Sequence, residues 1–134
     1  MLDADGAEVV LTFAAEDWWV SDVSSFCEGT ASQMFIETLE DSELLLLTPE
    51  SKEAALREIP ALERVFRLLL QRHLSRWQTR FYEHLAVSAT ERYLAFAARY
   101  PVLIQRLPQH QIAAYLGIAP ESLSRLRKKI SEKH

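Results

Sequence analysis

The stretch QHQIAAYLGIAPESLSRLRKKI at residues 109–130 decides the fold of the C-terminal part of the chain. Within it, Ile112, Ala113 and Leu116 recur at the spacing of one helix face. Gly117 follows directly, and glycine is the residue that most readily takes the left-handed conformation with which helices end. We therefore expect a short helix that stops at Gly117.

A second helix is predicted immediately after this glycine. Ile118 fills the turn, Pro120 suits the first helical position, and Leu123 and Leu126 return onto the first helix. Ala113 is small at the point where two helices joined by so short a turn come close together. These positions predict a helix-turn-helix pair, with an ordinary helical hairpin as the alternative.

The second helix carries polar and basic side chains on its outward positions. Arginine pairs with guanine edges and glutamate accepts from the cytosine amino group, whereas later cations would lie near phosphates. For each residue alone, the alternative is an ordinary surface role that complements the helix dipole. Together with one residue that opens the first helix, the candidate DNA-contacting residues are Gln109, Glu121, Ser122, Ser124, Arg125, Arg127, Lys128 and Lys129.

The charge of the chain is divided between its two parts. The formal net charge is −4, but residues 1–60 carry 14 acidic and two basic residues, a net of −12. Residues 61–134 carry five acidic and 13 basic residues, a net of +8. This asymmetry indicates an acidic part joined to a polyanion-binding end, although a surface that is simply rich in arginine is the alternative for the middle of the chain.

The first 60 residues are predicted to contain β-structure. EVVLTF at 8–13 is β-branched and alternating, WWV at 18–20 follows an acidic turn, and MFIETLEDSELLLLT at 34–48 contains two apolar stretches. Pro49 is expected to open a short helix that reaches about Glu58.

A long helix is predicted from residue 61 to about residue 85, a stretch without glycine or proline. Such a helix is about 37 Å long at 1.5 Å per residue, which is more than so small a body covers. Its apolar seam is therefore expected to meet a second copy. The predicted interface residues are Leu62, Phe66, Leu69, His73 and Trp77. Ser88 and Glu91 then form a capping box for another helix to about Tyr100.

The sequence LPQHQIAAYLGIAPESLSRLRKKI resembles the DNA-binding end of Crp/Fnr-type transcription regulators, in particular a bacterial branch that ends in PESLSRxRKK. EVVLTFAAEDWWVSDVSSFCEG resembles the later strands of the family's cyclic-nucleotide-binding β-roll, and EDSELLLLTPE resembles its closing strand. The resemblance implies an α+β protein. Residues 1–60 would form a partial, jelly-roll-like β-roll shortened on its N-terminal side, residues 61–86 a dimerisation helix, and residues 87–134 a helix-turn-helix DNA-binding domain.

The resemblance also implies a function, namely a sequence-specific transcription regulator that acts as a dimer. Its implied partners are double-stranded DNA, a second copy of the chain and RNA polymerase. Glu121, Ser122 and Arg125 match the family's base-contacting positions, whereas Pro120 stands where many members carry a further polar or basic contact.

The family's nucleotide pocket has a Gly-Glu pair and an arginine followed by a small hydroxyl residue. The matching positions here are Ser21-Asp22 and Ser32-Gln33. Asp22, Ser32 and Gln33 are thus the candidate ligand residues, with Asp22 suited to a ribose hydroxyl. A buried cyclic phosphate would lack its cation, so an intact cyclic AMP pocket is not expected, the effector is unidentified and no cofactor is predicted.

Other functional classes are less well supported. The four histidines lack metal-ligand spacing, and no phosphate-binding glycine loop or nucleophile elbow occurs, so an enzyme is not predicted. The single cysteine Cys27 and the lack of a long apolar run predict a cytoplasmic protein without membrane association. Two alternatives to the regulator remain, a protein-interaction module that has lost DNA binding and a small-ligand-sensing domain.

Overall fold

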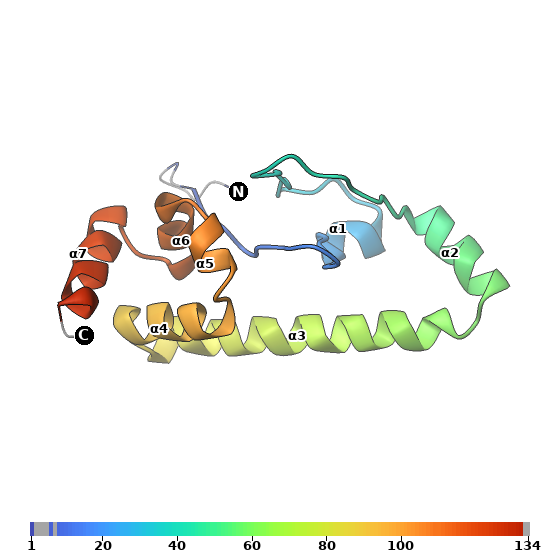
Figure 1. The fold of residues 1–134 in the computed structure, drawn as a ribbon. Helices are drawn as coiled ribbons and strands as arrows, with labels where there is room; N and C mark the ends of the chain where they lie inside the picture. Colours follow the sequence, from blue (N-terminus) through green and yellow to red (C-terminus); the bar gives the residue numbers. More distant parts are fainter. Residues whose placement is uncertain (2–5, 7, 133–134) are drawn as a thin grey trace. The chain divides into compact units, whose positions relative to one another are not determined.

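The structure, a computed structural model, describes residues 1, 6 and 8–132 (Figure 1). The described residues form seven helices: α1 Val23–Glu28, α2 Pro49–Glu58, α3 Leu62–Ala86, α4 Ala89–Arg99, α5 Leu103–Arg106, α6 Gln109–Leu116 and α7 Pro120–Ser131. The chain divides into two compact units. We call Ser21–Phe81 the middle unit, and Met1–Val20 together with Tyr82–His134 the C-terminal unit.

The predicted β-roll is wrong, because no strand occurs among the described residues, and the α+β class is corrected to a helical one. Residues 34–38 and 42–48 form neither helix nor strand. A strand is stable when a neighbour takes its backbone hydrogen bonds and a second layer covers its apolar face. Here Phe35, Ile36 and Leu45 remain 58%, 61% and 98% exposed, so the apolar runs lack the layer that their pattern implied.

Part of the predicted β-segment instead forms helix α1. Asp22 is its N-cap and accepts a 3.3 Å hydrogen bond from the backbone N–H of Ser25. Gly29 ends the helix at φ 67°, in the left-handed region. Asp22 as the N-cap and Gly29 as the C-cap thus define the two ends of a helix in a region that was predicted to be β-structure.

Helices α2 and α4 both begin with a reciprocal capping pair. At α2, Thr48 and Ser51 bond each other's backbone N–H groups, and Pro49 occupies the first turn. At α4, the predicted pair of Ser88 and Glu91 is confirmed, with 2.6 Å between Ser88 Oγ and Glu91 Oε2. The predicted long helix is also confirmed, as α3. Helix α5 was not predicted.

The buried core lies in the C-terminal unit. No residue of α1, α2 or α3 is buried, whereas every helix from α4 to α7 contributes to the core. The buried apolar residues are Phe96, Leu103, Leu107, Ile112, Ala113, Leu116 and Leu123. Because burial of apolar surface is the main favourable term in folding, this core fixes the relative placement of α6 and α7.

Candidate nucleic-acid interface

Helices α6 and α7 form the pair that the sequence predicts on either side of Gly117. Gly117 takes φ 66° and ψ 41°, and its N–H donates to the carbonyl of Ala113. The N–H of Ile118 donates to the same carbonyl at 3.1 Å. Both bonds end on the carbonyl of Ala113, and the left-handed Gly117 reverses the chain within a few residues, so that α7 begins at Pro120.

The contact between the two helices is close-packed. Ile112 and Ala113 of α6 are fully buried, and Leu123 of α7 is 1% exposed. Since the methyl group of Ala113 is entirely enclosed, a larger side chain there would have to displace a neighbour. His84 of α3 lies against Gly117 and backs the same turn. Sequence reasoning missed His84, because no feature of the 109–130 motif points to a residue on the preceding long helix.

One face of α7 is entirely polar and exposed. The positions i, i+3, i+4 and i+7 of a helix share a face, and on α7 they are occupied by Glu121, Ser124, Arg125 and Lys128. Leu123 is buried and Leu126 is half-buried on the other side. The packing on α6 therefore fixes which face of α7 is turned outward.

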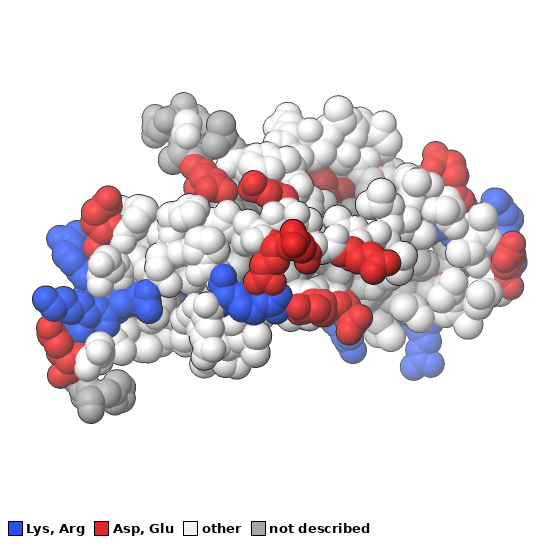
Figure 2. Space-filling view, turned by 45° about the horizontal axis from the view of Figure 1, so that its top comes forward, with Lys and Arg blue, Asp and Glu red and all other residues white. Residues whose placement is uncertain are grey.

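Positive charge gathers on α7. Figure 2 shows blue side chains collected over this helix at the left end of the view. Arg125, Arg127, Lys128 and Lys129 are exposed, and none of them forms an ion pair with a carboxylate of the described residues. The guanidinium of Arg125 donates to Ser122 Oγ at 3.3 Å, which holds it along the helix surface.

The candidate DNA-contacting residues are thus brought together with one exception. Seven of the eight lie on α7, where Ser122 is half-buried and the others are exposed. Gln109 lies on a different helix, as the exposed first residue of α6.

The five residues of the predicted dimer interface lie along α3. Leu62, Phe66, Leu69 and His73 are half-buried, and Trp77 is exposed. The indole Nε1–H of Trp77 donates to His73 Nε2 at 2.7 Å, so this imidazole nitrogen acts as an acceptor. Beside these residues runs an exposed apolar stripe on α3, which we call the α3 stripe: Leu70, Leu74 and Phe81, at 50%, 60% and 66% exposure.

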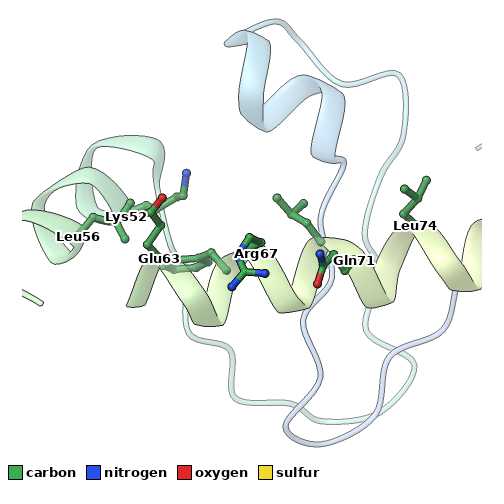
Figure 3. A pocket seen from close by; sticks show the side chains of 8 residues that line it. Lys52, Leu56, Glu63, Arg67, Gln71 and Leu74 are labelled. Atoms are coloured by element: carbon green, nitrogen blue, oxygen red, sulfur yellow. The ribbon is translucent and has the colours of Figure 1, made fainter. Parts of the chain in front are cut away.

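A groove of about 360 Å³ lies between α2 and α3 within the middle unit (Figure 3). The ammonium of Lys52 lies 5.7 Å from the centroid of the Phe66 ring, a cation–π arrangement at the groove wall. The groove overlaps the predicted dimer face at Phe66. The lining residues are Lys52, Leu56, Glu63, Phe66, Arg67, Leu70, Gln71 and Leu74.

The candidate ligand residues have local partners. Asp22 Oδ2 accepts a 2.7 Å hydrogen bond from Ser32 Oγ, and this bond is the main reason why the pKa of Asp22 lies below its ordinary value. Ser32 Oγ also approaches the carbonyl of Met34 at 3.1 Å. Gln33, which stands between Ser32 and Met34 in the sequence, is exposed. Asp22 and Ser32 therefore lie close together because Asp22 is the cap of α1 and Ser32 belongs to the loop that follows this helix.

No helix within the described residues combines the length and the apolarity needed to cross a membrane. Within the same residues, no three or more His, Cys, Asp or Glu side chains gather in a way that suits a metal ion. Comparison of the chain with protein-family models, with curated proteins and with solved structures finds no match.

Proposed function

We propose that the chain is a sequence-specific, double-stranded-DNA-binding transcription regulator that acts as a dimer. The observation that carries the proposal is the exposed, cation-rich face of α7, set by close packing on α6. A helix presented in this way fits the major groove, which is about 12 Å wide.

The first and last turns of α7 would make different contacts with DNA. Glu121, Ser122 and Arg125 lie in its first turns, and the first turns of the second helix contact base edges in this motif. Arginine offers two parallel donors to guanine, and glutamate accepts from cytosine. Lys128 and Lys129 lie in the last turn, where their charge would neutralise phosphates without reading sequence.

Dimerisation would supply a second α7 helix to contact a second half-site. The proposed surface comprises the five predicted residues of α3 and the α3 stripe beside them, because contiguous exposed apolar side chains mark interaction surfaces. Two copies related by a two-fold axis would present two α7 helices to half-sites about 34 Å apart, or a multiple of that distance.

The test begins with selection of bound duplexes from a random-sequence pool. Fluorescence anisotropy then measures the affinity for the selected duplex and for a random duplex at several salt concentrations. A specific regulator is expected to prefer the selected duplex by about a thousandfold or more, with log affinity falling linearly with log salt.

The matched control replaces Lys128 and Lys129 with glutamine. This variant is expected to bind both duplexes more weakly and with a shallower salt slope, because fewer counterions are released. A protein that enriches no sequence and retains no duplex at low salt would contradict the proposal and favour the protein-interaction alternative.

A further inference from the structure

Residues 13–18, FAAEDW, form an irregular segment of the C-terminal unit that lies against the helices of that unit, and we call this segment the strap (Figure 1). The ring of Phe13 lies 6.2 Å from that of Phe96 and 5.2 Å from that of Tyr115, measured between centroids. These are aromatic contact distances, and Phe13 is one of the partly buried residues packed on the core.

Two further side chains of the strap have partners on the same unit. The carboxylate of Glu16 accepts two hydrogen bonds from the Arg106 guanidinium, at 2.9 and 3.1 Å. Such a two-point pair specifies orientation as well as charge. The ring of Trp18 lies 5.8 Å from that of Tyr100. A carboxylate and two aromatic rings thus attach the strap.

The surface beneath the strap, which we call the strap site, is built from several helices. Phe96 comes from α4, Tyr100 is the C-cap of α4, Arg106 comes from α5 and Tyr115 from α6. No single element could form this surface alone, so the strap site exists only when α4–α6 are packed together.

The backbone of the strap forms a turn of its own. A turn closed by the 3.1 Å bond from Trp18 N–H to the Ala15 carbonyl contains Asp17 at φ 64°, a conformation that aspartate tolerates. Phe13 and Ala15 are only half-buried, and Glu16, Asp17 and Trp18 are exposed. A short exposed segment with few anchors can dissociate without unfolding the core beneath it.

We infer that the strap site is a peptide-binding site and that the strap is its built-in occupant. The site selects an irregular segment with an aromatic, an acidic and a second aromatic side chain at the spacing of Phe13, Glu16 and Trp18. Its chemistry is independent of the cationic face of α7, so DNA binding and peptide binding can be measured separately.

The first test adds the strap sequence as a separate peptide. A synthetic peptide of residues 8–20 is titrated by calorimetry into the full chain and into a full-chain variant with Phe13→Ala and Glu16→Arg. The variant is expected to bind the peptide at least about tenfold more tightly than the unaltered chain, because a tethered strap competes at high effective concentration. Equal affinity for both chains, or no binding to the folded variant, would overturn the inference.

The second test exchanges the charges of Glu16 and Arg106 and leaves Phe13 and Trp18 unchanged. Trp19→Phe and Trp77→Phe make Trp18 the sole tryptophan, and its accessibility to a neutral quencher is measured in the full chain. Glu16→Arg and Arg106→Glu are each expected to raise quenching by about twofold, and their combination is expected to restore the original value. Equal quenching in all four chains, with circular dichroism unchanged, would show that the pair does not position the strap.

Discussion

The imidazole of His84 lies directly against Gly117. A Cβ atom added to Gly117 would stand 2.7 Å from His84 Cε1 and 3.3 Å from His84 Nδ1. Gly117 is also at φ 66°, a conformation that side chains other than glycine adopt rarely. Two separate constraints, one of the backbone and one of packing, therefore require glycine in the turn between α6 and α7.

The two constraints can be separated with a second glycine. Gly29 has nearly the same φ, 67°, but an added Cβ there would meet nothing within 4 Å. Gly29→Ala is expected to cost about 1 kcal/mol through backbone strain alone. Gly117→Ala is expected to cost about 1 kcal/mol more, because the ring of His84 must move, as measured by urea unfolding followed by circular dichroism.

The His84→Ala background gives the control for that comparison. In that background, the cost of Gly117→Ala is expected to fall towards the cost of Gly29→Ala, since only the φ strain remains. An unchanged cost would mean that His84 moves aside freely and that the contact has no energetic effect.

Arg125 and Lys128 are expected to differ in how they affect DNA affinity, if α7 reads DNA as proposed. Arg125→Ala is expected to lose about 1–3 kcal/mol on the selected duplex and to relax preference at one base pair per half-site. Lys128→Ala is expected to weaken all duplexes alike and to lower the salt slope by about one unit per lost phosphate contact. If Arg125→Ala reduced both affinities equally, Arg125 would be a backbone contact instead.

The α3 stripe is expected to mediate self-association. Leu74→Glu places a charge at its centre, and the dissociation constant of the dimer should rise at least about a hundredfold, equivalent to about 2.7 kcal/mol. Ser75→Glu adds the same charge at the neighbouring exposed position, which points away from the stripe, and should leave the dimer intact. Analytical ultracentrifugation measures both. A monomeric unaltered protein at high concentration would exclude this role for α3.

Attachment of the strap is expected to weaken in acid. The hydrogen bond from Arg106, aided by its charge, keeps the pKa of Glu16 below its ordinary value. A carboxyl group with a lowered pKa stabilises the attached form fully above its ordinary pKa, and this stabilisation is lost as pH falls through the lowered value. The sole-tryptophan chain should therefore show a rise in Trp18 quenching in that acidic range. Glu16→Gln should remove the transition, and its persistence would assign it to another group.

Local signals in the sequence determine much of the helical structure. Gly117 and Pro120 mark the turn between α6 and α7, and Ser88 with Glu91 marks the start of α4. Each of these signals acts within a few residues, through a backbone conformation or a cap, and needs no distant partner. For this reason the predictions of these helix ends are confirmed, although the predicted β-roll is wrong.

Features that depend on a covering layer were not predictable in the same way. The alternation at residues 8–13 indicates a face to be covered, but it does not specify what covers it. In the structure, Phe13 is covered by Phe96 and Tyr115, which no local pattern connects to it. The exposed face of α7 follows from its own periodicity, whereas the position of His84 depends on tertiary packing.

The C-terminal unit is discontinuous along the chain, and this has a consequence during synthesis. Glu16 and Arg106 are 90 residues apart, so the strap leaves the ribosome well before its site has been made. At about 5–20 residues per second, the delay is roughly 5–18 seconds. During that interval Phe13 and Trp18 lack their aromatic partners on α4 and α6, and only Glu16 and Asp17 keep the segment hydrated. The aromatic side chains of the strap therefore stay uncovered during synthesis until the C-terminal helices have emerged and packed beside them.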